Sequence, residues 1–232
     1  MTWRDAAEAH ARADYPREAC GLVIVVEGRE EYVACRNAAD REDHFEIDPD
    51  EYAAAEERGA IVAIFHSHPD APPEPSEADR VGCEASGVPW HILGVPSMRW
   101  AVVEPSGYQA PLVGRQFEHG RLDCYAIIRD WYARERGIEL PDFSRRWQWW
   151  LQGDDLYRAH FREAGFEATD EPLAEGDVLL MQIGAPVPNH AGVYLDGDMI
   201  LHHLQNRLSS RDVYGGFWRR VTTMRLRYVG NA

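Results

Sequence analysis

The segment Phe65-His66-Ser67-His68-Pro69 lies at the centre of the predicted fold of this 232-residue chain, and Ser76-Glu77-Ala78-Asp79 follows it after a short loop. It ends an apolar run, residues 60–65, of the kind that forms a buried strand. Because residues i and i+2 of a strand point to the same face, the two imidazoles are expected to point the same way. Two histidines and one aspartate, with a fourth position left open, are typical ligands of a catalytic Zn²⁺ site. The sequence therefore predicts a strand that ends in a metal site.

The composition is typical of a globular protein and excludes several classes of function. A formal net charge of -15 argues against a nucleic-acid partner, which would need a basic surface. The chain lacks a basic segment followed by an apolar one at its start, and lacks an apolar stretch of 18 residues, so we expect neither a signal peptide nor a membrane segment. No short repeated spacing relates the four cysteines, which argues against a disulfide framework and against a cysteine-type zinc site.

Strands and helices are predicted on both sides of the histidine segment. The apolar runs and the turn residues predict strands at residues 22–26, 30–35, 60–65, 90–96, 99–104, 176–181, 190–195 and 199–203. The helices are expected at residues 3–13, 49–59, 76–86 and 154–163, with a further helix that begins at Cys124 and is ended by Gly137. Periodicity is weak between Gly107 and Gly120. We therefore expect an α+β protein of two domains, residues 1–110 and 115–232.

The histidine segment resembles the motif of the JAB1/MPN/Mov34 metallopeptidases. Glu18, in Pro16-Arg17-Glu18-Ala19-Cys20-Gly21-Leu22, matches an upstream glutamate of that family. The resemblance implies a JAB1/MPN-like (cytidine-deaminase-like) α/β domain. It implies that Glu18 is the general base for a zinc-activated water and that Ser76 hydrogen-bonds the oxyanion. The zinc ligands that it implies are His66, His68 and Asp79.

The same residues also have simpler explanations. Ser76 and Asp79 have the spacing of a capping box, in which a serine and an acidic residue hold the first turn of a helix. A His-x-His pair at the end of a strand, taken alone, is more often a surface feature than a ligand pair. Glu18 by itself is an ordinary carboxylate. The joint occurrence of all five residues favours the metal site, and Ser76 is able to serve in both.

The second half contains a cysteine at a predicted helix start. Asp123 is in the position of an N-cap, and Cys124 is the first helical residue. The helix dipole favours the thiolate and thus reactivity, whereas the neighbouring negative charge opposes it, and free cysteines are commonly inert. A later histidine, His190, starts a predicted strand. A cysteine at a helix start with a histidine on a strand is the arrangement of a cysteine hydrolase.

This half resembles the NlpC/P60 peptidases through Asp123-Cys124 and Asn189-His190-Ala191-Gly192-Val193-Tyr194. The resemblance implies a papain-like α+β domain in which Cys124 attacks an amide carbonyl and His190 transfers the proton. The family spacing of twelve residues implies that His202 orients His190. Because adjacent strand residues face opposite ways, a two-residue turn at Asp196 would instead place His203 there. The sequence leaves the turn open, and the family spacing favours His202.

The two motifs in this order resemble the tail assembly protein K family of tailed phages, prophages and gene transfer agents. That resemblance implies a component of the virion tail tip, made in the host cytoplasm, with other tail-tip proteins and peptidoglycan peptide stems as partners. We therefore expect a tail-tip peptidoglycan hydrolase with a second, zinc-dependent peptidase site. The alternative is a tail assembly or maturation protein that processes or binds another tail component, with one or both sites inactive. An isopeptidase of ubiquitin-like tags is a third hypothesis, which leaves the second domain unexplained.

Overall fold

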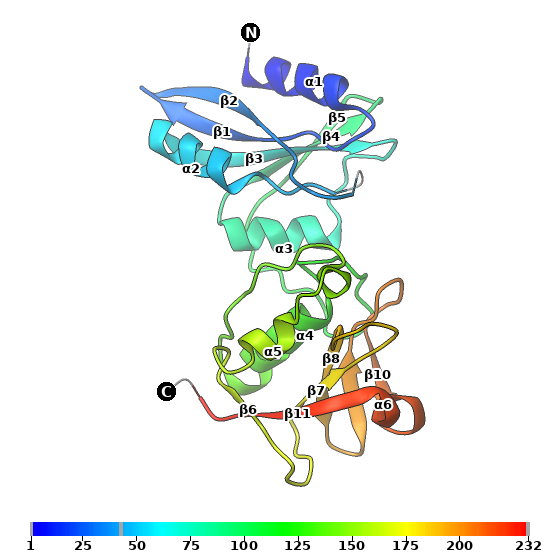
Figure 1. The fold of residues 1–232 in the computed structure, drawn as a ribbon. Helices are drawn as coiled ribbons and strands as arrows, with labels where there is room; N and C mark the ends of the chain where they lie inside the picture. The colour runs from blue at the N-terminus through cyan, green and yellow to red at the C-terminus, as the bar shows by residue number, and fades with distance from the viewer. Residues whose placement is uncertain (1, 42–43, 231–232) are drawn as a thin grey trace. The chain divides into compact units, whose positions relative to one another are not determined.

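The computed structural model describes residues 2–41 and 44–230, and the chain divides into two compact units, Met1–Gln109 and Ala110–Ala232 (Figure 1). Each unit has a sheet and a core of its own. No helix within the described ranges is long and apolar enough to cross a bilayer.

The first unit is a five-stranded sheet with helices on both faces. The strand order is β2-β1-β3-β4-β5, and every neighbouring pair is antiparallel except β3 and β4. Parallel neighbours need a crossover, and here it contains a helix, α3. Helix α1 lies over one face and α2 and α3 over the other (Figure 1). The elements are α1 Trp3–Asp14, β1 Cys20–Val26, β2 Arg29–Cys35, α2 Pro49–Arg58, β3 Ala60–Pro69, α3 Glu77–Ser86, β4 Trp90–Val95 and β5 Arg99–Val103.

Strand alternation along β3 assigns each side chain to one of the two cores. Phe65 packs with the α1 core, whereas His66 faces the other side, where the ring of Phe45 stacks on it at 4.5 Å. His68, two residues on, shares the face of His66. The two histidines therefore point toward the face that carries α3.

The second unit is a six-stranded antiparallel sheet of order β10-β9-β8-β7-β11-β6. Helix α4 packs against β8 and β9 and continues as the single π-turn η1, which ends at Gly137 in the left-handed conformation. Trp218 of α6 packs against the opposite face of the sheet. The elements are α4 Cys124–Trp131, η1 Tyr132–Arg136, η2 Trp149–Leu151, α5 Leu156–His160, β6 Phe166–Ala168, β7 Val178–Met181, β8 His190–Leu195, β9 Met199–His202, β10 Ser210–Val213, α6 Gly216–Val221 and β11 Thr222–Tyr228.

Strand β3 extends four residues past the predicted end at residue 65, and the other main differences from the predicted elements are in the second unit, where β6, α6 and β11 had no prediction. The helix predicted at residues 154–163 is only Leu156–His160, because Asp155 caps it and the chain turns before Gly165. Strand β10 had no prediction, since its residues Ser-Arg-Asp-Val carry almost no apolar alternation and it lies at the sheet edge. Pairing with β9, rather than local propensity, makes it a strand.

Candidate functional sites

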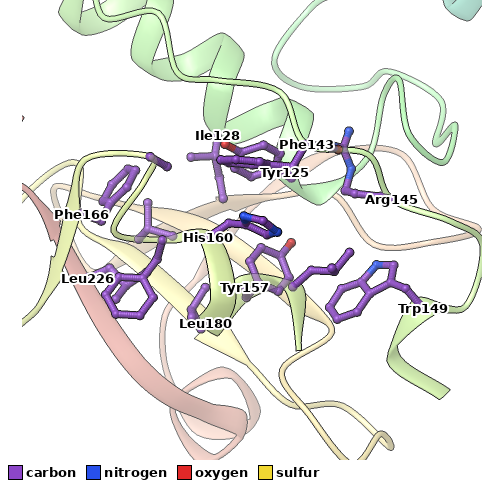
Figure 2. Close-up of a pocket in the computed structure, with 14 residues that line it drawn as sticks. Tyr125, Ile128, Phe143, Arg145, Trp149, Tyr157, His160, Phe166, Leu180 and Leu226 are labelled. Atoms are coloured by element: carbon purple, nitrogen blue, oxygen red, sulfur yellow. The ribbon is translucent and has the colours of Figure 1, made fainter. Parts of the chain in front are cut away.

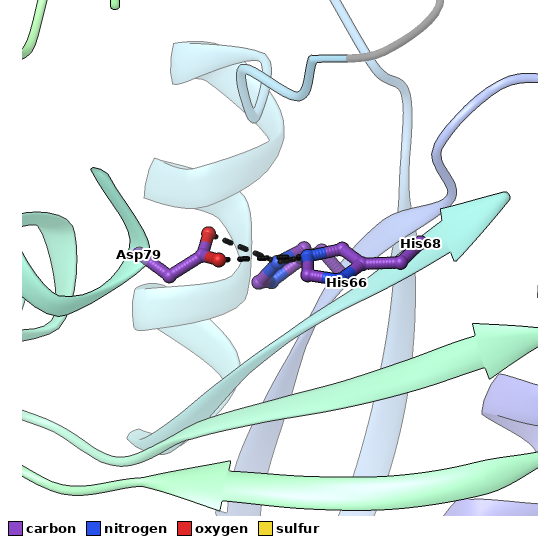
Figure 3. A group of neighbouring side chains, drawn as sticks. All are labelled: His66, His68 and Asp79. Carbon is purple, nitrogen blue, oxygen red and sulfur yellow. Dashed lines mark hydrogen bonds and ion pairs between the residues drawn. The ribbon is translucent and has the colours of Figure 1, made fainter. Parts of the chain in front are cut away.

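The predicted metal ligands converge at the end of β3. Figure 3 shows the imidazoles of His66 and His68 facing the carboxylate of Asp79 from α3. Nε2 of His66 lies 3.1 Å from Oδ1 of Asp79, and Nε2 of His68 lies 3.5 Å from Oδ2. The two Nε2 atoms are 3.1 Å apart, and one donor atom from each of the three residues lies within 4.8 Å of the others. Such a cluster has the size of a metal coordination sphere.

Neighbouring groups orient these three side chains. His68 Nδ1 donates a hydrogen bond to the carbonyl of Pro72 at 2.9 Å, which leaves the lone pair of its neutral ring at Nε2, the atom that faces the cluster. The Ser76 hydroxyl donates to Oδ2 of Asp79 at 2.7 Å, and the Asp79 amide donates back to that hydroxyl at 3.1 Å. The capping box is therefore present, and it holds a candidate ligand at the same time.

The ionised state of Asp79 also suits a divalent cation. Burial would raise the pKa of Asp79, but the hydrogen bonds from His66 and His68 outweigh it and hold that pKa well below its ordinary value. Burial lowers the pKa of His68, yet its bonds to Asp79 and Pro72 leave the net shift upward. An ionised carboxylate and two imidazole nitrogens directed at one point are a donor set that suits Zn²⁺.

Glu18 lies at the same end of the sheet. Cys20 pairs with His66 in the ladder between β1 and β3, and the amide of Ser67 donates to the carbonyl of Ala19. Continued by two residues, this antiparallel register places Glu18 opposite His68. Its side chain is buried, and its negative charge contributes to raising the pKa of His68. The residue matched to the upstream glutamate is thus beside the candidate ligands.

The second candidate site begins at the first turn of α4. Asp123 is the N-cap, and its Oδ1 accepts hydrogen bonds from the amides of Tyr125 and Ala126 at 3.0 and 2.9 Å. The next residue, Cys124, is therefore held at the helix start. Its Sγ lies 3.1 Å from the hydroxyl oxygen of Tyr157, and the backbone N–H of Ala191, the neighbour of His190, also acts on the thiol.

At this cysteine, desolvation changes the pKa more than the helix N-terminus does. Burial and then the charge of Asp123 raise the pKa of Cys124 to about 11, although the bonds from Tyr157 and Ala191 act in the opposite direction. The thiol is therefore protonated at neutral pH. Within the described residues Sγ contacts the Tyr157 hydroxyl and His190 contacts His202, and no hydrogen bond joins Sγ to His190 directly.

The register of the β8–β9 hairpin decides which histidine lies beside His190. Leu195 pairs with Met199 across a three-residue turn, so His202 pairs with Gly192 and shares the face of His190. His190 Nε2 and His202 Nδ1 are 3.1 Å apart. His203 faces the other side, 5.1 Å from the ring of Phe117.

The imidazole of His190 is in the form that a general base needs. Burial, followed by the proximity of His202 and His203, lowers the pKa of His190 well below its ordinary value. The ring is therefore neutral at physiological pH and has one lone pair with which to accept a proton.

Two residues of this site had no signal in the sequence. Tyr157 lies on the short helix α5, and only the tertiary fold brings its hydroxyl to Cys124. Asp212 lies on β10, and its Oδ2 is 3.2 Å from Nε2 of His202.

Behind Tyr157 is an apolar cavity of about 40 Å³, shown in Figure 2, which Tyr125, Ile128, Leu180 and Leu226 help to line. It is too small to hold a peptide substrate.

We expect the pair between Asp123 and Arg145 to contribute strongly to stability. Arg145 Nε donates to Oδ2 of Asp123 at 2.8 Å, and both side chains are almost fully buried. Arg145→Met would leave a buried carboxylate without this partner, which costs about 3–5 kcal/mol. Urea denaturation followed by tryptophan fluorescence measures the loss. The control is Arg158→Met, which removes an exposed partner of Asp155 and should cost less than about 1 kcal/mol. Equal losses in both variants would contradict the prediction.

Known proteins match the same two halves of the chain. Residues 2–103 match the model of prokaryotic homologs of the JAB domain, and residues 114–227 match that of the NlpC/P60 family. The chain is 43% identical over 227 residues to the tail tip assembly protein K of Escherichia phage N15, with 97% of this chain and 93% of the relative covered. It is 40% identical over 177 residues to the protein of that name from Escherichia phage lambda, with 76% and 86% covered. A solved JAB1/MPN domain protein from Archaeoglobus fulgidus is 18% identical, covers 47% of this chain and 87% of its own, and has a TM-score of 0.31.

Proposed function

The chain belongs to the family of tail tip assembly protein K, and on that premise we propose that it is a tail-tip hydrolase of peptidoglycan peptide stems. Its JAB/MPN domain followed by an NlpC/P60 domain confirms the two-domain interpretation of the sequence motifs. The observation that carries the proposal is the arrangement of Cys124 at the start of α4 beside Ala191, with His190 and His202 in hydrogen-bond contact. In the virion, this activity would open the cell wall locally at the tail tip.

The proposed reaction uses the groups of the thiol site in sequence. The neutral His190 takes the proton of Cys124, and the sulfur attacks the amide carbonyl carbon as the thiolate forms. The protonated His190 then gives that proton to the leaving amine as the C–N bond breaks, and water hydrolyses the thioester. Because the pKa of the thiol is raised to about 11, the proton transfer to His190 has to accompany the attack. The bond proposed is the one that joins the D-glutamate side chain to the diamino acid.

The first domain is proposed to be a zinc-dependent peptidase of the JAMM type. His66, His68 and Asp79 would hold the ion, whose Lewis acidity lowers the pKa of a bound water to about 7. Glu18 would accept the proton of that water. Ser76 now donates its hydroxyl to Asp79, so its proposed role at the oxyanion requires that hydroxyl to rotate.

Ser76→Ala separates the helix cap from the support of the metal site. Loss of an N-cap hydroxyl should lower the free energy of unfolding by about 1 kcal/mol. Because the hydroxyl also orients Asp79, zinc affinity should fall by about 10–100-fold. The matched control is Thr2→Ala, which removes the same capping box from α1, away from the cluster. Thr2→Ala should lower the stability by a similar amount and leave the zinc affinity unchanged. Competition with a chromogenic chelator measures the affinity. Equal zinc affinities in the two variants would refute the second role of Ser76.

Digestion of purified muropeptides tests the proposed function directly. The full-length protein, kept reduced and supplied with zinc, is incubated with stem peptides, and the products are identified by mass spectrometry. We expect products with a new free amine on the diamino acid. Intact stem peptides after prolonged incubation would sink the proposal.

An assembly role is the second candidate function. The observations that favour it are the names of the two relatives and the raised pKa of Cys124, which describes a thiol with little intrinsic reactivity. In that case the protein would bind or process another tail component, and the stem peptides would remain uncut.

A further inference from the structure

The hydrogen bonds of the thiol site continue beyond His202 to a carboxylate. Nε2 of His202 lies 3.2 Å from Oδ2 of Asp212, while Nδ1 of the same ring lies 3.1 Å from Nε2 of His190. Ser210 pairs with His202 in the ladder between β9 and β10, and Asp212, two residues on, therefore shares the face of His202. Trp218 packs on the His202 ring at 4.4 Å, edge-to-face. The chain of contacts thus runs from His190 through His202 to Asp212.

An ionised carboxylate only accepts hydrogen bonds, and this restricts every proton in the chain. His202 must carry its proton on Nε2 in order to donate to Asp212. A neutral His202 then has its lone pair on Nδ1, which accepts from Nε2–H of His190. The remaining lone pair of His190 is consequently on Nδ1. Nδ1 is the ring nitrogen closer to the main chain. The backbone amide of the next residue, Ala191, acts on the sulfur of Cys124.

We propose that Asp212 is a positioning residue that sets the tautomers of His202 and His190, and thereby makes His190 Nδ1 the nitrogen that takes the proton of Cys124. This inference rests on the proposed thiol chemistry and adds a fourth residue to the proposed site of Cys124, His190 and His202. The protons balance: one moves from sulfur to His190 Nδ1 and later to the leaving amine, while those on both Nε2 atoms stay in place. Asp212 also compensates, through His202, the positive charge that develops on His190.

The inference requires a neutral His202, and the surroundings supply it. Burial lowers the pKa of His202, although Asp212 acts in the opposite direction. The charged and titratable groups that act on it are Asp212 on β10, His190 on β8 and Arg207 in the loop after β9. If His202 became doubly protonated, His190 Nε2 would have to accept instead of donate. The base would then hold its proton on Nδ1 and be blocked.

Nitrogen-15 NMR of histidine-labelled full-length protein, together with iodoacetamide alkylation of Cys124, tests the proposal without a peptidase substrate. In the wild type we expect His190 as the Nε2–H tautomer. In Asp212→Asn the side-chain amide is able to donate to His202, so we expect a mixture of His190 tautomers. Alkylation of Cys124 at pH 7 should be slowed at least about 10-fold, since the corresponding change in a serine-protease triad lowers kcat about 10⁴-fold. Asp212→Glu keeps the carboxylate and should restore most of the alkylation rate.

The control is Asp198→Asn, which removes an exposed carboxylate in the turn between β8 and β9 that bonds Tyr194 and Arg219. It should change neither the tautomer nor the alkylation rate. An Nδ1–H tautomer of His190 in the wild type would overturn the inference even if no variant folds, and so would an unchanged tautomer in Asp212→Asn. If the wild type shows the expected tautomer but leaves muropeptides intact, the proposed function fails and the assignment of Asp212 stands.

Discussion

Replacing Cys124 with alanine is expected to abolish the cleavage of peptidoglycan stem peptides and to lower kcat/KM by at least about 10⁴-fold. Alanine removes the only atom that is proposed to bond to the substrate, and no general base compensates for a missing nucleophile. The substitution keeps the helix start intact, because the cap of α4 is made by Asp123 and not by the cysteine. Separation of the muropeptide products by liquid chromatography gives the remaining rate.

Two further variants make this result specific. Cys35→Ala removes another buried thiol, one that lies in the first unit, and should leave stem cleavage unchanged. His68→Ala should likewise spare stem cleavage, because it acts on the metal site alone. Wild-type cleavage by Cys124→Ala, with loss of cleavage in His68→Ala, would assign the stem-peptide activity to the first domain instead.

Removing one predicted zinc ligand is expected to reduce bound zinc from one ion per chain to none. His68→Ala and Asp79→Asn each leave two of the three donor side chains. A single lost ligand is decisive here, since the cluster provides only three ligands and the fourth position belongs to solvent. Dialysis against zinc at neutral pH followed by inductively coupled plasma mass spectrometry gives the stoichiometry.

Zinc should also stabilise the wild-type first domain against heat. A ligand present at 1,000 times its dissociation constant adds about 4 kcal/mol to the free energy of unfolding, and removal with a chelator should reverse this gain. His10→Asn is the matched control, because His10 is a partly buried histidine of the same unit that pairs with Asp14. A well-folded wild type that retains no zinc would falsify the metal site and favour the assembly role.

Much of both candidate sites was predictable because the signals are local. Alternation in a strand places His66 and His68 on one face. The preference for serine and aspartate at the N-cap places Ser76 and Asp123 at helix starts. These patterns involve residues within a few positions of one another. The structure therefore has the strand and both helix starts where the sequence predicted them.

The properties that depend on partners distant in sequence were not predictable. Tyr157 approaches Cys124 from 33 residues away, and nothing near either residue signals the contact. The pKa of Cys124 is another case, because position at a helix start favours the thiolate whereas burial opposes it more strongly. Burial is a property of the assembled core and has no local motif.

By itself, the sequence determined that this chain carries a histidine–aspartate cluster and a helix-start cysteine in two successive domains. Only the tertiary structure decided that His202 rather than His203 lies beside His190, and that Asp212 completes the hydrogen-bonded chain. The physical reason is that strand period and helix capping are set by neighbouring residues, whereas facing partners depend on the turn length and pairing register of whole strands. A shift of one residue in that register would turn every side chain of β9 to the other face.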